Sequence, residues 1–118
     1  MFLQLAHTKT DVFKASKLFT LECYKATRSF PPDERFAMTL QIRRAALSVH
    51  LNIAEGCSRK SAAERKRYFE IARGSVIEID TALDIAVELE YVSLEKLSVL
   101  GEYLISTFKQ LSAMINHS

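Results

Sequence analysis

Few residues in this chain interrupt a helix, and this most limits the folds open to it. Its 118 residues contain three glycines and two prolines. Turn residues gather at three places, Pro31–Asp33, Gly56–Ser61 and Glu90–Ser93. No stretch alternates apolar and polar residues as a strand does. The chain therefore predicts four helices, at about residues 8–27, 33–55, 61–89 and 94–115.

Apolar residues recur every three and four positions within each segment, which is typical of one buried helical face. The stripes are Val12, Ala15, Phe19, Cys23 and Ala26; Phe36, Leu40, Ala46, Leu47, Val49 and Ile53; Phe69, Ala72, Val76, Ile79, Leu83 and Ala86; and Leu97, Leu100, Leu104, Phe108, Leu111 and Ile115. Helices of this length joined by short loops favour antiparallel neighbours. The predicted fold class is all-α, a single-domain antiparallel up-down-up-down four-helix bundle over residues 1–118.

The third segment carries a second apolar stripe beside the first, formed by Ile71, Ala82, Ile85 and Leu89. A helix that buries two faces needs a wider apolar arc than a surface helix. We therefore expect this helix to face both its own bundle and something else.

Local signals mark the helix ends. Pro31 disfavours a helical residue before it, and Gly56 is expected to supply the left-handed residue that closes the second helix. Ser61 with Glu64 forms a capping-box pattern, which predicts the start of the third helix.

Composition favours a folded cytoplasmic protein. Hydrophobic residues make up 48% and charged residues 25%, which argues against disorder. No apolar stretch approaches the roughly 18 residues of a membrane span, and the first residues lack the pattern of a signal peptide. Cys23 and Cys57 form no CxxC pair, so reduced thiols are expected.

Charge is distributed unevenly along the chain, although the net charge is only +2. Residues 59–67 hold five basic groups and one acidic, whereas residues 78–90 hold five acidic groups and no basic one. Helices of 20 residues are about 30 Å long, so the two clusters are expected at opposite ends of the bundle.

The basic cluster is the feature that implies a partner, because such clusters displace counterions from a phosphate backbone. The predicted nucleic-acid-binding residues are Arg59, Lys60, Arg65, Lys66 and Arg67, supported where exposed by Arg43, Arg44, Lys14 and Lys17. Tyr68 and Phe69 can stack on bases if they are exposed. The alternative is a solvated surface with Phe69 in the core.

A polar line runs along one face of the second helix, formed by Gln41, Arg44, Ser48, Asn52 and Glu55. Antiparallel pairing places it against Arg73, Ser75 and Glu78, with Gly74 allowing close approach. A paired network that fixes register is favoured over a ligand site, because buried polar groups are costly unless paired. Glu55 faces the negative end of the helix dipole, so it should have a partner such as Arg59 or Arg65.

Catalytic patterns are missing from the sequence. His7, His50 and His117 are scattered, with no metal-binding pair and no phosphate-binding glycine loop. Spacing alone leaves a Cys57–His50 pair open. We predict no enzyme activity, no cofactor and no metal.

The segment from Leu40 to Gly56, LQIRRAALSVHLNIAEG, together with Arg59, Ile71–Ser75 and Glu78, resembles the four-helix bundle proteins encoded in 23S rRNA intervening sequences. Phe30-Pro31-Pro32 also fits, whereas His50 stands where the family usually has proline. The accessory protein of diversity-generating retroelements resembles the same family.

The resemblance implies a bacterial homopentameric ring with a basic surface for nucleic acid and no established catalytic activity. The positions that mark the family are Arg43, Arg44, Asn52, Glu55, Arg59 and Arg73.

Two functions follow as hypotheses. The first is a non-enzymatic, oligomeric bundle that binds RNA or DNA through the turn between the second and third helices. The second is an adaptor or scaffold that docks another protein, for example a reverse transcriptase or a ribosome-associated partner.

Overall fold

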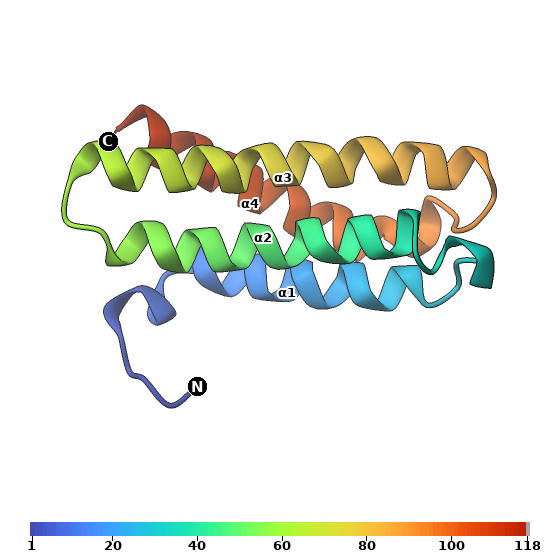
Figure 1. Ribbon diagram of the computed structural model, residues 1–118, viewed down its shortest axis with the longest axis horizontal. Coiled ribbons are helices and arrows are strands. Elements are labelled where there is room, and N and C mark those ends of the chain that lie inside the picture. The colour runs from blue at the N-terminus through green and yellow to red at the C-terminus, as the bar shows by residue number, and fades with distance from the viewer. Residues whose placement is uncertain (118) are drawn as a thin grey trace.

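Four α-helices make up most of the chain in the computed structural model, which describes residues 1–117 (Figure 1). They are α1 (Asp11–Thr27), α2 (Met38–Ser58), α3 (Ala62–Glu88) and α4 (Ser98–Asn116). Three 3-10 turns precede or connect them: η1 (Ala6–Lys9), η2 (Pro32–Glu34) and η3 (Glu95–Leu97). Residues 1–117 contain no strand, so the all-α prediction is confirmed.

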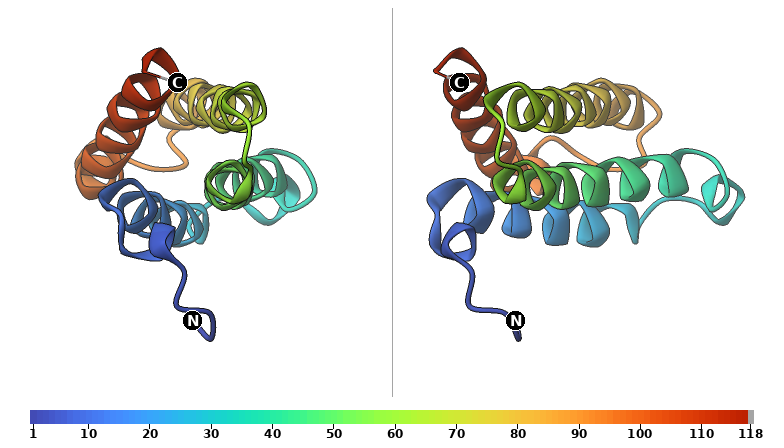
Figure 2. Two further views of the ribbon diagram at one scale, coloured as in Figure 1. Left: turned by 90° about the vertical axis from the view of Figure 1, so that its left-hand side faces the viewer. Right: turned by 60° about the vertical axis from the view of Figure 1, so that its left-hand side comes forward.

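The helices form a bundle in which α1, α2 and α3 lie along the long axis and α4 crosses obliquely (Figures 1 and 2). Each helix contacts the next along the chain, and α4 also contacts α1. The fully buried side chains fill the space between all four, among them Phe19, Val49, Ile53, Val76, Ile79 and Leu111. Residues from every predicted stripe therefore reach one common core.

The start of α2 differs from the prediction. Ala37 has φ −121° and ψ −105°, outside the helical region, so α2 begins at Met38 rather than residue 33. Phe36 is consequently outside the helix and 78% exposed, and Leu47 is also exposed. Ile42 and Ala45 fill the core instead.

Gly56 does not close α2 in a left-handed conformation, which corrects the expected role of this residue. No glycine has positive φ, and α2 continues to Ser58. A Cβ at Gly56 would lie 2.5 Å from Cε1 of Phe69, a distance that real Cβ atoms essentially never show. Glycine is therefore the residue that fits at position 56, because Phe69 of α3 approaches the backbone of α2 closely there.

The start of α3 agrees with the capping prediction. Ser61 is extended, with φ −83° and ψ 141°, and its Oγ accepts a hydrogen bond from the Glu64 N–H at 3.1 Å. This bond satisfies one of the amides that a first helical turn leaves without a partner.

The end of α3 depends on Glu90, a predicted turn residue whose left-handed backbone the sequence did not indicate. Glu90 has φ +62°. Its N–H donates to the carbonyl of Val87, and the N–H of Tyr91 donates to that of Ala86, both at 2.9 Å. This is the Schellman arrangement, in which glycine usually holds the left-handed position. The Tyr91 hydroxyl also donates to Glu34 at 2.7 Å, which ties this corner to η2.

Candidate nucleic-acid interface at the turn between α2 and α3

Arg59 is one of two arginines that hold the turn between α2 and α3. Its guanidinium forms an ion pair with Glu55 at 2.8 Å, donates to the Tyr68 hydroxyl at 3.2 Å and lies 5.0 Å from the centre of the Tyr68 ring. Glu55 thus has the compensating partner expected from the helix dipole. The hydrogen bond to Tyr68 raises the pKa of Arg59 further above its already high value.

Arg65 fixes the same turn from the α3 side. One of its guanidinium nitrogens donates to the carbonyl oxygens of Cys57 and Arg59, both at 3.3 Å. The guanidinium also lies 5.9 Å from the centre of the Phe69 ring. Two of the five cations predicted to bind nucleic acid therefore hold the turn, Arg59 through side chains and Arg65 through backbone carbonyls.

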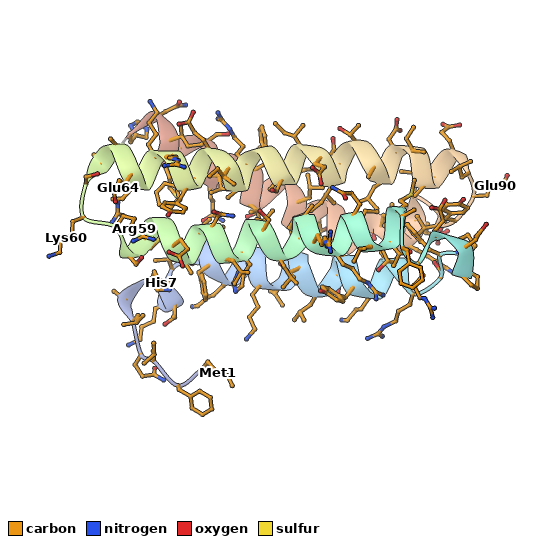
Figure 3. The ribbon with its side chains drawn as sticks, in the orientation of Figure 1. Met1, His7, Arg59, Lys60, Glu64 and Glu90 are labelled. Carbon is orange, nitrogen blue, oxygen red and sulfur yellow. The ribbon has the colours of Figure 1, made fainter. Side chains whose placement is uncertain are left out.

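The other three cations, Lys60, Lys66 and Arg67, are exposed. Within residues 1–117 none of their side chains forms an ion pair or a hydrogen bond. Figure 3 shows Lys60 projecting from the end of the bundle, near Arg59 and Glu64. These side chains are available to an anionic partner.

The surrounding charge has the same sign. We call residues 6–9 and 55–67 the basic end; they contain six Lys or Arg and two Asp or Glu. At the other end, residues 28–35 and 84–96 contain three Lys or Arg and six Asp or Glu. Figure 3 shows His7 and Lys60 at one end of the bundle and Glu90 at the other. The expected separation of the two charge clusters is observed.

Arg43 and Arg44 lie away from the turn and differ from each other. Arg43 donates to the Thr27 hydroxyl at 2.8 Å and to the Tyr24 carbonyl at 3.3 Å, and it stacks 4.9 Å from the Tyr24 ring centre. It therefore joins α2 to α1 and is not a free cation. Arg44 is exposed and lies outside the polar ladder.

Base stacking by the aromatic pair is not supported by the geometry. Phe69 is 2% exposed and belongs to the core. Tyr68 is half-buried with Arg59 over its ring. Phe69 is therefore a core residue and is not available to stack on bases.

The polar line on α2 forms the expected network with α3 in part. Gln41 donates to Glu78 at 2.8 Å, and Ser75 donates to Ser48 at 3.1 Å. Asn52 donates to the carbonyl of Ser48 at 2.8 Å and to its hydroxyl at 3.1 Å. The Gln41–Glu78 and Ser75–Ser48 bonds fix the register of α2 against α3, whereas the Asn52 bonds stay within α2.

Two members of the predicted network lie elsewhere. Arg73 donates to Ser112 of α4 at 3.3 Å. Gly74 is exposed, and no atom lies within 4 Å of the position a Cβ would take. The close approach expected at Gly74 is therefore wrong, and Gly56 is the glycine at which α2 and α3 meet.

A buried pair between α1 and α2 was missed, because its members are 34 residues apart and no motif marks them. Ser16 Oγ lies 2.7 Å from Nδ1 of His50, and the ring of Phe13 lies 4.2 Å from that of His50. Burial, followed by the charges of Lys17 and His7, lowers the pKa of His50. Ser16 is fully buried and His50 is half-buried, so the serine hydroxyl itself is closed to solvent.

The two cysteines form no disulfide and are free thiols. Burial raises the pKa of Cys57, while the nearby positive charge of Arg65 lowers it. Residues 1–117 hold no group of three or more His, Cys, Asp or Glu side chains placed to bind a metal ion. Across the same residues no helix is long and apolar enough to cross a membrane.

Comparison with known proteins places the fold in a family. The model of the 23S rRNA-intervening sequence protein family matches residues 8–117. A crystal structure from Bacteroides thetaiotaomicron, described as a protein of unknown function from the S23 ribosomal protein family, is similar with a TM-score of 0.78 and 24% identity. The alignment covers 88% of this chain and 97% of that one.

Among proteins with curated descriptions, none matches this chain. Neither the family description nor that of the similar structure names an enzyme. The match over nearly all of the described residues shows that the chain belongs to the 23S rRNA-intervening sequence protein family.

Proposed function

We propose that this protein is a non-enzymatic, oligomeric, cytoplasmic protein that binds RNA or DNA through the basic end of its bundle. One observation carries the proposal: the side chains of Lys60, Lys66 and Arg67 are exposed and unpaired within residues 1–117. They lie on the turn between α2 and α3 and on the start of α3, a region that Arg59 and Arg65 hold in place.

Rigidity matters because an ordered site loses less conformational freedom on binding than a flexible one. The free cations gain affinity by releasing counterions from the phosphate backbone, without reading base identity. Binding is therefore salt-dependent and weakly selective for sequence.

Assembly of an antiparallel up-down-up-down bundle into a ring, such as a pentamer, would place several basic ends side by side. The pairing of Gln41 with Glu78 and the meeting of Gly56 with Phe69 support the antiparallel course. Ile85 and Leu89, two members of the second stripe on α3, are exposed in the single chain, which supports their burial in an assembly. Several linked weak sites bind one long polymer more tightly than a single site does.

A mobility-shift titration with structured ribosomal RNA fragments and matched DNA tests this function. For three phosphate contacts per subunit, raising salt from about 50 to about 200 mM should weaken binding about 40-fold. The variant Lys60→Gln/Lys66→Gln/Arg67→Gln should lose most of the affinity. Its matched control, Arg28→Gln/Arg35→Gln/Lys96→Gln at the opposite end, should keep it. Absence of binding at low salt, or equal loss in the control, contradicts the proposal.

An adaptor that docks another protein, such as a reverse transcriptase or a ribosome-associated partner, is the second candidate. The exposed apolar residues Ile85 and Leu89 beside the acidic end favour it. A pull-down distinguishes the two functions: capture that survives the basic triple substitution and is lost in Ile85→Asp/Leu89→Asp supports the adaptor.

A further inference from the structure

A groove opens between α3 and α4 toward the acidic end of the bundle. Its volume is about 570 Å³, and its walls are mostly apolar, formed by Leu83, Val87, Leu97, Leu100, Leu104 and Ile105. Asp80 and Asp84 also line it, one helical turn apart on α3. The groove arises because α4 diverges from α3 in this half of the bundle (Figures 1 and 2).

Small residues leave the groove unfilled on the α4 side. Ser98 and Gly101 line it, and no atom lies within 4 Å of the Cβ position of Gly101. A larger side chain at Gly101 would therefore fit without disturbing the chain's own core. Leu94, which also lines the groove, is 74% exposed. Ile105 is 53% exposed, whereas Leu83, Leu97, Leu100 and Leu104 are each 9% exposed or less. The apolar surface of the groove that the single chain leaves uncovered is thus mostly at Leu94 and Ile105.

The same chain carries an uncovered apolar segment at its other end. We call residues 1–5 the arm. Met1, Phe2 and Leu3 are 95%, 87% and 69% exposed, and Leu5 is also exposed. Figure 3 shows Met1 away from the bundle, beyond α1. Four apolar side chains in five residues therefore contact solvent.

The geometry points to an assembly in which the arm of one copy occupies the α3–α4 groove of a second copy. This inference specifies the self-association in the proposed function and rests on that part of it alone.

Size and charge match between arm and groove. An extended five-residue segment spans at most about 17 Å, while residues 98–105 of α4 rise about 10 Å along the groove. Lys9 is the first charged residue after the arm, and Asp80 and Asp84 lie in the groove. The opposite charges favour this pairing and oppose the docking of an acidic segment.

The arm lies away from the groove of its own chain. His7 packs against Phe13 of α1 with ring centres 5.0 Å apart, which holds the base of the arm on α1. The bundle measures 43 × 30 × 25 Å, and Figure 1 shows the arm below α1 with α3 on the far side.

A contact between two different surfaces has a definite consequence for assembly. Each copy offers one arm and one groove, so each bound copy presents a further arm and a further groove. Such heterologous contacts generate a closed ring when the rotation closes and a filament when it does not.

The test measures the mass of the full chain in solution by light scattering over a range of concentrations. Phe2→Asp/Leu3→Asp removes the arm contact, and Gly101→Leu fills the groove. Each variant should run with the mass of one chain, while the unaltered protein runs as an oligomer. The matched control Phe36→Asp/Leu21→Asp, at exposed positions outside the arm and groove, should stay oligomeric.

Mixing the two variants gives the sharpest readout. The arm-defective chain keeps its groove and the groove-filled chain keeps its arm, so the mixture should form heterodimers and nothing larger. Circular dichroism confirms that both variants are folded. An arm-defective chain that keeps its oligomeric mass, or a mixture that stays monomeric, overturns the arm–groove contact and leaves nucleic-acid binding untouched. A monomeric unaltered protein overturns this contact together with the proposed self-association.

Discussion

The two sides of α3 are built in opposite ways. Against α2, it packs so closely that Gly56 has no room for a Cβ, and the hydroxyls of Ser48 and Ser75 are paired. Against α4, it is tied through Arg73 and Ser112 and then diverges into an open groove. One helix therefore has a closed seam against α2 and a seam against α4 that opens into a groove.

Gly56→Ala is the substitution expected to break the closed seam most strongly. Glycine to alanine inside a helix normally stabilises a protein by about 0.5–1 kcal/mol. Here the new Cβ meets the Phe69 ring, and forced overpacking costs about 1–3 kcal/mol. We expect a net loss in the free energy of unfolding, measured by urea denaturation.

A second substitution checks the cause of that loss. Phe69→Leu in the Gly56→Ala background relieves the clash, so the double variant should lose less stability than the two single losses together. Strict additivity of the two losses contradicts the proposed contact.

Thr107→Val tests whether the α4 side is also less well paired than the α2 side. Thr107 is fully buried, and its hydroxyl has no hydrogen-bond partner within residues 1–117. Removing an unpaired buried hydroxyl should raise the free energy of unfolding by about 1 kcal/mol. Thr20→Val is the matched control, because the Thr20 hydroxyl donates to the carbonyls of Ser16 and Ala46. It should lower stability, and equal effects at both sites count against this interpretation.

Gly101→Ala makes the same glycine-to-alanine change on the open α4 side of α3, where we expect the opposite effect on stability. No atom lies within 4 Å of the new Cβ, so the helix gains about 0.5–1 kcal/mol in thermal or urea denaturation. Gly74→Ala, equally unobstructed on α3, should behave alike. A destabilised Gly101→Ala variant is incompatible with an open groove.

A change of pH should affect the contact between α1 and α2, where His50 packs, and neither side of α3. Its pKa is lowered by burial, then by Lys17 and His7. The unfolded chain therefore binds a proton more readily, so stability falls as pH drops below the ordinary histidine value of 6.5 and levels off below the folded pKa. His50→Gln should remove this dependence, measured as urea midpoints across the range, while His117→Gln at an exposed site should keep it.

The sequence predicted the elements of the fold better than their contacts. Periodicity located four helices, and the Ser61 cap is a local signal that needs no tertiary information. The sequence places the start of α2 too early. Phe36 fits the hydrophobic pattern of a helix, but the backbone at Ala37 is not helical and leaves Phe36 outside α2. Gly56 was assigned to a turn because the position of Phe69 is a tertiary fact.

The candidate site shows the same limit. The basic cluster is visible in the sequence, but the division between Arg59 and Arg65, which bind the turn, and Lys60, Lys66 and Arg67, which are free, depends on side-chain geometry. The ring of Tyr68 and two backbone carbonyls decide it, and no spacing rule encodes either.

The left-handed backbone at Glu90 has a consequence for the order of folding. A non-glycine residue loses about 1–2 kcal/mol in this conformation, so the short peptide around it does not hold the corner by itself. Its stabilising partners, Ser29 and Glu34, are 62 and 57 residues away from Tyr91. Contacts that close such long loops form after local ones. We therefore expect the hairpin of α2 and α3 to appear early on the folding pathway and α4 to dock last.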